Sequence, residues 1–183
     1  MYEHIHVLGA SGSGTSTLGV ALATRLGARH LDVDDYYWEP TEPPFVRPRP
    51  VAQRQRLLDV DLARQAAWVL SGSLCGWGDR YIPRFDCVVF LRVPTALRLA
   101  RLRRREEERF GDGLVPGGAM HENHRAFLAW AAEYDEGGPD MRSLARHRAW
   151  LARLACPVVS LEREMAVAEQ VGRVLRLRSD GVG

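Results

Sequence analysis

The sequence predicts an α/β fold built around a five-stranded, doubly wound parallel sheet. Short apolar runs alternate with longer stretches of helical periodicity along the 183 residues, and such alternation is typical of parallel strands joined by helical crossovers. Three polar motifs each follow a predicted strand, and ligands bind beyond the carboxyl ends of the strands in open α/β sheets. The length predicts a single domain over residues 1–183.

The chain opens with a strand, a glycine loop and a helix. Residues 4–8 are apolar and run into glycine, and residues 15–26 have apolar side chains at helical spacing before Gly27, a typical helix end. Residues 28–33 predict a second strand with an acidic end. Residues 36–50 contain several prolines and aromatics, so we expect an ordered loop over a pocket.

The middle of the chain continues the alternation of helices and strands. Residues 51–67 regain helical periodicity, and residues 68–70 predict a short strand that runs into a serine-glycine-serine turn. Residues 86–92 (DCVVFLR) form the clearest apolar run, as expected of a central strand that is buried on both faces. Residues 94–110 then predict a helix.

Glycine and proline gather after this helix and indicate a change of structure. Two further helices are expected at residues 120–134 and 141–154, separated by the breaker sequence EGGPD. We expect the region of residues 104–140 to act as a helical lid. Residues 157–161 predict the last strand, and residues 165–177 the closing helix.

Composition limits the partners and the compartment. The net charge of +2 favours neither nucleic acid nor a membrane surface, and neither a signal peptide nor a membrane-spanning run is visible. We therefore expect a cytoplasmic protein, monomeric or homodimeric. The chain contains no lysine, so all 25 of its Lys and Arg residues are arginines. The cysteines have no metal-binding pattern, so we expect reduced thiols at Cys75, Cys87 and Cys156.

A glycine loop follows the first strand. Residues 9–16 (GASGSGTS) have the spacing of a Walker A loop, with Thr15 where that motif has lysine. Glycines let successive backbone N–H groups face one anion, and the helix that begins there adds its positive end. The alternative is a glycine turn that only joins strand to helix. The residues predicted to bind the phosphates of a nucleoside triphosphate are Gly9, Ser11, Gly12, Ser13, Gly14, Thr15, Ser16 and Thr17.

An acidic run ends the second strand. If strand geometry continued through this run, alternation would carry Asp32 and Asp34 to the same side of the chain. We predict that Asp32, together with the hydroxyl of Ser16, holds Mg²⁺, and that Asp34 orients or deprotonates the phosphate acceptor. The alternative is an acidic turn that caps the next element.

Arginines are the candidates to replace the positive charge of the missing lysine. The predicted helix 94–110 carries Arg98, Arg101, Arg105 and Arg109 at spacings of three and four, which places them along one face. We predict catalytic roles for Arg101 and Arg105 and a nucleotide contact for Arg109. The alternative is a solvated arginine face, balanced by Glu106, Glu107 and Glu108.

The acceptor is expected near the end of the third strand. The serine-glycine-serine turn lies there, and a tryptophan and an arginine follow it. Aromatic rings stack on flat ligands and an arginine fork binds carboxylate or phosphate, which suits an aromatic or anionic acceptor. Packing is the alternative role for the aromatic residues. The predicted acceptor contacts are Asp34, Ser71, Gly72, Ser73, Trp77 and Arg80.

Together these motifs resemble the P-loop small-molecule kinase group, which includes shikimate, gluconate and nucleoside monophosphate kinases. The resemblance rests on residues 9–16, on the Asp-Val-Asp of residues 32–34 and on the turn at residues 71–73, and it covers most of the chain. The loop and the arginine-rich helix that ends in RFG are also similar to bacterial adenylate-kinase-related proteins. The resemblance implies a P-loop NTPase fold like that of nucleoside monophosphate kinases, with ATP and Mg²⁺ as cofactors.

Two functions remain open at this point. The first is an ATP-dependent kinase that phosphorylates a small-molecule acceptor such as a nucleotide or a hydroxy acid. The second, motivated by Thr15, is a nucleotide-binding regulator with little or no catalysis. Both functions need a nucleoside triphosphate, but only the kinase needs an acceptor.

Overall fold

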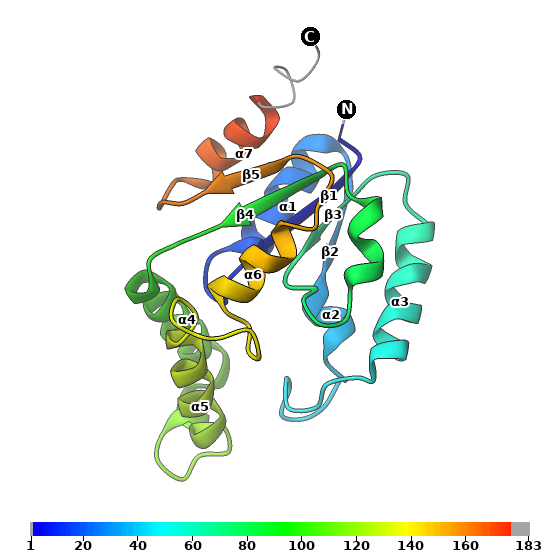
Figure 1. Ribbon diagram of the computed structural model, residues 1–183. Coiled ribbons are helices and arrows are strands. Elements are labelled where there is room, and N and C mark those ends of the chain that lie inside the picture. The colour runs from blue at the N-terminus through cyan, green and yellow to red at the C-terminus, as the bar shows by residue number, and fades with distance from the viewer. Residues whose placement is uncertain (1, 177–183) are drawn as a thin grey trace.

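Five parallel strands form one sheet in the computed structural model, which describes residues 2–176 (Figure 1). Their order across the sheet is β2-β3-β1-β4-β5, and every pairing is parallel. The predicted α/β class with a doubly wound, five-stranded parallel sheet is confirmed. The strands are β1 (His4–Gly9), β2 (Arg29–Asp32), β3 (Trp68–Ser71), β4 (Cys87–Leu91) and β5 (Val158–Leu161).

Helices connect these strands and cover both faces of the sheet (Figure 1). Two short 3₁₀ helices, η1 (Asp79–Arg84) and η2 (Gly111–Leu114), complete the secondary structure of the described residues. The α-helices are α1 (Thr15–Leu26), α2 (Val33–Tyr37), α3 (Val51–Ala63), α4 (Thr95–Phe110), α5 (His121–Ala132), α6 (Leu144–Leu151) and α7 (Val167–Arg176).

The sheet is buried on both faces because its strands are apolar along most of their length. One core cluster joins strand residues such as Val7 with Leu22 of α1 and Val174 of α7. The other cluster includes Leu58 of α3 and Trp150 of α6. The two layers hold the carboxyl ends of β1, β2 and β3 at one edge, where the three polar motifs follow them.

The main difference from the predicted elements lies at the end of β2. The strand stops at Asp32, and α2 begins at Val33 because the Asp32 carboxylate caps the helix by accepting the Asp34 N–H at 3.0 Å. The expected alternation of Asp32 and Asp34 along a strand is therefore wrong. Helix α2 takes up the start of the region predicted as a loop, which leaves residues 38–50 without helix.

Several helices are shorter than predicted. Helix α3 stops at Ala63, and α5 stops at Ala132. Helix α6 begins only after Ser143, whose hydroxyl caps it by accepting the Arg146 N–H at 3.1 Å. Position 177, the predicted end of the last helix, lies outside the described residues.

Helices α4 and α5 form an arm that extends away from the sheet (Figure 1). The two helices pack against each other, and η2 lies against both. The arm contains most of the region predicted as a lid, residues 104–140, and its movement stays a prediction. Between residues 2 and 176, no helix combines the length and apolar character needed to cross a membrane.

Candidate functional site

The glycine loop, residues 9–16 and called the phosphate loop from here on, joins β1 to α1. Gly12 (φ 80°) and Gly14 (φ 95°) have left-handed backbone conformations that favour glycine. Gly12 also lies so close to α4 that an added Cβ would be 2.6 Å from the carbonyl oxygen of Arg98. The N–H groups in the first turn of α1 have no partner within the helix, so they are available to an anion.

Ser13 lies inside the phosphate loop, and its role in binding phosphate stays a prediction. Its side chain is 1% exposed, its Oγ has no hydrogen-bond partner among residues 2–176, and its N–H donates to the Ala10 carbonyl at 3.1 Å. A Cβ added to Gly9 would lie 2.5 Å from this Oγ. Ser13 therefore packs inside the loop and shapes it, and this geometry does not support a phosphate contact through its hydroxyl.

Three side chains from three elements meet at the strand ends. Ser16 Oγ donates to Asp32 Oδ2 at 2.5 Å, and Ser71 Oγ donates to the same oxygen at 3.2 Å. The Ser71 hydroxyl is also 2.9 Å from Nε2 of His30. The two residues predicted to hold Mg²⁺, Ser16 and Asp32, are therefore in direct contact, although their role as metal ligands stays a prediction.

This cluster of oxygens fits a small, hard cation. Mg²⁺ is usually held by one or two protein oxygens together with phosphates and water, and the Ser16 hydroxyl and Asp32 carboxylate lie beside the start of α1. The described residues contain no group of three or more His, Cys, Asp or Glu side chains able to hold a metal ion. The arrangement suits a metal that binds jointly with a phosphate.

Asp34 lies in the first turn of α2 and is exposed to solvent. The surrounding protein atoms nevertheless desolvate its carboxylate and raise its pKa above the usual value, and the charge of Asp32 raises it further. Arg142 and Arg105 lower the same pKa. The side chain predicted to act on the acceptor thus lies in the electric field of arginines from two other segments.

The arginine row of α4 is not a uniform solvated face. Arg101 pairs with Glu164 at 3.1 Å, in the loop between β5 and α7. Arg105 and Arg109 both contact the carboxylate of Glu106, at 3.2 Å and 4.0 Å. Glu106 balances these two arginines, as the alternative of a solvated arginine face expected, but its carboxylate is buried, at 6% exposure.

The turn at residues 71–73, called the acceptor turn from here on, is fixed on two sides. Gly72 has φ 114°, and an added Cβ would lie 2.6 Å from Cβ of Val33 in α2. Ser73 is 4% exposed, and its Oγ lies 3.2 Å from Nε2 of His147. The turn therefore adjoins α2, the helix that carries the predicted base.

The two predicted acceptor contacts beyond this turn have different surroundings. Trp77 is 6% exposed, and its Nε1 has no hydrogen-bond partner within the described part of the chain. Arg80 is exposed and pairs with Asp59 of α3 at 3.4 Å. Near Trp77 lies a different arginine, Arg54 of α3, with its guanidinium carbon 5.8 Å from the centre of the tryptophan ring.

Arg54 is a candidate site residue that the sequence pattern did not indicate. It is 8% exposed, and no carboxylate from residues 2–176 lies within 4.0 Å of its guanidinium. Its Nε donates to the Arg49 carbonyl at 2.6 Å, and its guanidinium carbon is 3.8 Å from the centre of the Tyr37 ring. Burying a cation without a counter-ion is unfavourable, so this position suits an anion from a ligand.

Arg142, which precedes α6, is a second candidate site residue that the sequence pattern did not indicate. Its charge lowers the pKa of Asp34 and also that of His147. Its guanidinium carbon is 5.5 Å from the centre of the Trp130 ring in α5. Arg142 and Asp34 are far apart in the sequence, so no local motif could have indicated that they are neighbours.

Comparison with known proteins gives a family match over most of the chain. The family model described as an AAA domain matches residues 5–127. A protein of Bacillus subtilis (strain 168), described as "Uncharacterized protein YqaC", is 48% identical over 175 residues, which cover 96% of this chain and 97% of that protein.

Solved structures similar to this chain include two small-molecule kinases. Shikimate kinase from Acinetobacter baumannii in complex with shikimate has a TM-score of 0.62 at 18% identity and covers 99% of this chain and 96% of its own. A gluconokinase from Sinorhizobium meliloti 1021 has a TM-score of 0.51 at 19% identity. The match covers 97% of this chain and 94% of that chain. At these identities the similarity shows a shared fold.

Proposed function

Since the chain belongs to the AAA domain family and shares its fold with a shikimate kinase and a gluconokinase, we propose that it is an ATP-dependent phosphotransferase of the P-loop small-molecule kinase group with a small, anionic acceptor. The phosphate loop would bind the triphosphate, and Ser16 and Asp32 would hold Mg²⁺. The acceptor would lie between Asp34, the acceptor turn and two arginines, Arg54 and Arg142.

The hydrogen bond between Ser16 and Asp32 carries this proposal. It joins the first turn of α1 to the end of β2 at 2.5 Å, so a hydroxyl and a carboxylate lie beside the N–H groups that would face the phosphates. An acidic residue that only capped α2 would not need a serine of α1 as a second partner. A bound Mg²⁺ would neutralise charge that develops on the transferred phosphoryl group.

On the nucleotide side, the phosphate loop offers backbone N–H groups but lacks the lysine that Walker A loops also use. The N–H groups of residues 14–17 would bind the phosphates, and Thr15 adds no charge. Arg105 is half exposed at its side chain and acts on Asp34, so it is the best placed α4 arginine to supply the missing positive charge. Arg101 would first have to leave Glu164, and Arg109 would contact the nucleotide from the last turn of α4.

On the acceptor side, Asp34 would position the attacking oxygen. For an alcohol acceptor, the acceptor oxygen bonds to the γ-phosphorus, the bond from that phosphorus to the β,γ-bridging oxygen breaks, ADP leaves, and the proton passes to the Asp34 carboxylate. For a phosphate acceptor there is no alcohol proton to remove, so Asp34 would orient the acceptor.

The anionic character of the acceptor follows from unpaired arginines. Arg54 is buried without a carboxylate partner in the described residues, and the unpartnered Nε1 of Trp77 is near it. An arginine fork binds carboxylate and phosphate equally readily, so hydroxy acids and nucleotides both fit. The hydroxyls of Ser71 and Ser73 already contact Asp32 and His147, which leaves the backbone of the turn for the acceptor.

The alternative is a nucleotide-binding regulator, and one observation favours it. Thr15 stands at the lysine position, and both predicted catalytic arginines, Arg101 and Arg105, contact glutamates. If these contacts persist in the nucleotide complex, phosphoryl transfer would be slow. The regulator and the kinase therefore differ in their response to an acceptor.

A binding screen separates these functions. The midpoint of thermal unfolding would be measured with Mg²⁺ and ATP, GTP or ADP, and then with hydroxy acids and nucleoside monophosphates at saturating Mg·AMPPNP. At a ligand concentration of 100 Kd the stabilisation is about 2.7 kcal/mol. We expect stabilisation by Mg·ATP and further stabilisation by one anionic acceptor. Stabilisation by nucleotide alone would favour the regulator, and no response to any nucleotide would contradict both functions.

Replacement of the predicted base gives a sharper test. Asp34→Asn keeps the shape of the side chain, so we expect its affinity for Mg·AMPPNP to stay within about twofold of wild type. Phosphoryl transfer to an alcohol acceptor should fall by about 100-fold or more, because general base catalysis is lost. Asp35→Asn, the neighbouring exposed carboxylate, is the control. Wild-type turnover in Asp34→Asn would disprove the role of Asp34.

A further inference from the structure

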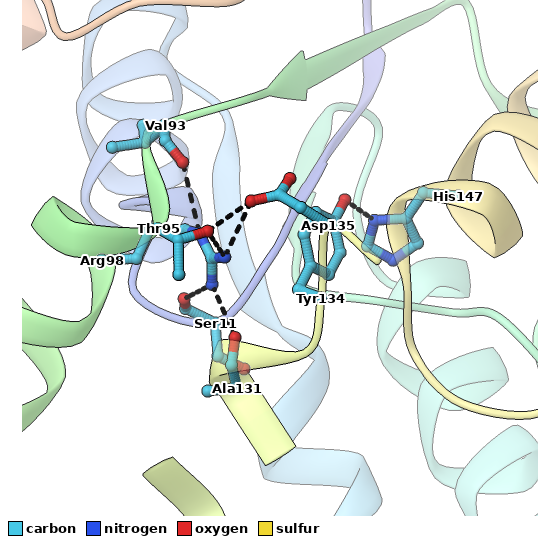
Figure 2. A network of polar contacts seen from close by, with 8 residues as sticks. All are labelled: Ser11, Val93, Thr95, Arg98, Ala131, Tyr134, Asp135 and His147. Atoms are coloured by element: carbon cyan, nitrogen blue, oxygen red, sulfur yellow. Dashed lines mark hydrogen bonds and ion pairs between the residues drawn. The ribbon is translucent and has the colours of Figure 1, made fainter. Parts of the chain in front are cut away.

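A buried arginine at the start of α4 contacts the phosphate loop from the protein interior (Figure 2). Arg98 is 1% exposed, yet its guanidinium has acceptors on several sides. Its Nε donates to the carbonyl of Val93 at 3.2 Å, its Nη1 to those of Ser11 at 3.3 Å and Ala131 at 3.2 Å, and its Nη2 to Thr95 Oγ1 at 2.8 Å. The guanidinium thus joins the phosphate loop to the end of α5.

Asp135 supplies the counter-charge for this arginine. Its Oδ2 lies 3.6 Å from Nη2 of Arg98 and also accepts a hydrogen bond from Thr95 Oγ1. A buried cation is tolerated only while its hydrogen bonds and its counter-ion stay in place. The position of Ser11 in the phosphate loop is therefore tied to Asp135 through one side chain.

The preceding residue, Tyr134, points to the other half of the site (Figure 2). Its hydroxyl is 2.7 Å from Nδ1 of His147, and Nε2 of His147 is 3.2 Å from Oγ of Ser73 in the acceptor turn. All three side chains are buried, at 3%, 0% and 4% exposure. Burial lowers the pKa of His147 to about 3, so the ring is neutral and has one donor and one acceptor nitrogen for these two hydroxyls.

We propose that Tyr134 and Asp135 are positioning residues that set the phosphate loop and the acceptor turn relative to each other. Asp135 acts on the loop through Arg98 and Ser11, and Tyr134 acts on the turn through His147 and Ser73. The inference rests on the proposed function, because it assigns the two ends of this network to nucleotide and acceptor.

Tyr134 and Asp135 are consecutive in the chain, and this couples the two halves of the network. Adjacent Cα atoms are about 3.8 Å apart, so Tyr134 and Asp135 cannot shift independently by much. Phosphoryl transfer depends on the separation of acceptor and γ-phosphate, and a displacement of about 1 Å can reduce a rate by about 100-fold. A single segment bonded to both sides would hold that separation constant.

Two conservative variants test the proposal, one for each half. Asp135→Asn removes the counter-charge of Arg98, so we expect the Kd for Mg·AMPPNP, measured by calorimetry, to rise about tenfold. Tyr134→Phe keeps the ring and removes the hydroxyl, so the same Kd should stay within about twofold of wild type. In ¹H–¹⁵N spectra of the free protein, Tyr134→Phe should shift the signals of Ser73 and His147, and Asp135→Asn those of Ser11 and Gly12.

Matched controls separate positioning from a general loss of stability. Asp79→Asn removes a carboxylate that accepts from Trp150 Nε1 at 3.0 Å and from Arg153 at 2.6 Å, and neither partner belongs to the network. Tyr81→Phe removes a hydroxyl that donates to the Gln55 carbonyl at 3.1 Å. Neither control should change the Kd for Mg·AMPPNP. If Asp135→Asn does not fold, Arg98→Lys replaces it, because lysine keeps the charge and loses the fork.

The outcomes are distinct. Nucleotide affinity lowered only by Asp135→Asn or Arg98→Lys, with spectral changes at the expected ends, supports the proposal. Equal effects of Tyr134→Phe and Asp135→Asn on the Kd, or no effect of either, would overturn it. Failure of the wild-type protein to bind Mg·AMPPNP would instead contradict the proposed function.

Discussion

Two buried histidines make the stability of the fold depend on pH. Desolvation lowers the pKa of His6 from 6.5 to about 4 and that of His147 from 6.5 to about 3. Below pH 6.5 the unfolded chain binds protons on these rings that the folded chain does not. Stability is therefore complete above pH 6.5 and is lost as the pH falls toward the pKa values of the folded state.

The His147→Gln variant isolates one of these contributions. Each histidine changes the free energy of unfolding by up to about 1.4 kcal/mol per pH unit in this range. We expect His147→Gln to be less stable than wild type at pH 7 but to lose less stability between pH 7 and pH 5, as measured by urea unfolding. His121→Gln, at a partly exposed histidine of α5, is the control. Equal pH dependence in His147→Gln and wild type would contradict the assignment.

Residue types and spacing predicted the oxygen cluster but not the buried cations. Ser16 and Asp32 belong to recognisable motifs at the ends of strands, and they are in contact. Arg54 was not singled out in the sequence, and Arg98 was grouped with the other arginines of α4, because burial is set by packing of distant segments. Arg54 has no carboxylate partner within the described residues, whereas Arg98 has hydrogen bonds and a counter-ion. Only tertiary structure reveals this difference.

At the level of elements, the phosphate loop depends on its contact with α4. Gly12 and Gly27 both have positive φ, at 80° and 65°. A Cβ on Gly12 would lie 2.6 Å from the backbone oxygen of Arg98, whereas a Cβ on Gly27 would meet nothing within 4 Å. The same substitution at these two glycines therefore separates backbone strain from displacement of the loop.

Gly12→Ala should both destabilise the protein and weaken nucleotide binding. Gly27→Ala should cost about 1–2 kcal/mol through backbone strain and leave the Kd for Mg·AMPPNP within about twofold. Gly12→Ala should cost more, because the loop must also move away from α4, and its Kd should rise by about tenfold or more. Urea unfolding and calorimetry measure the two effects, and equal Kd values for the two variants would contradict the role of the loop.

The elements were predicted well where local signals were strong. Helix α1 begins and ends as expected, because the glycine loop and Gly27 mark both ends. The β2–α2 junction was not predicted, since Asp32 is both the last strand residue and the cap of α2. Asp32 and Asp34 are nevertheless neighbours, because they belong to one capped turn.

At the level of the whole molecule, alternation of strands and helices was sufficient to predict the sheet. It could not predict that Arg142 acts on Asp34, because the two residues come from distant segments that only folding brings together. The core is divided into two layers, one on each face of the sheet. The layers fix the strand ends, and the loops and the α4–α5 arm beyond them carry the candidate chemistry (Figure 1).

The decisive measurement is acceptor-dependent transfer of the γ-phosphoryl group. Wild-type protein and Asp34→Asn would be incubated with Mg·ATP and separate hydroxy acids, nucleosides and nucleoside monophosphates, with phosphorylated products identified by mass spectrometry and ³¹P NMR. We predict a phosphorylated product from one class of anionic acceptor with wild type and, where that acceptor is an alcohol, at least about 100-fold less with Asp34→Asn. Binding of Mg·ATP without transfer to any acceptor would contradict the kinase and leave a nucleotide-binding regulator.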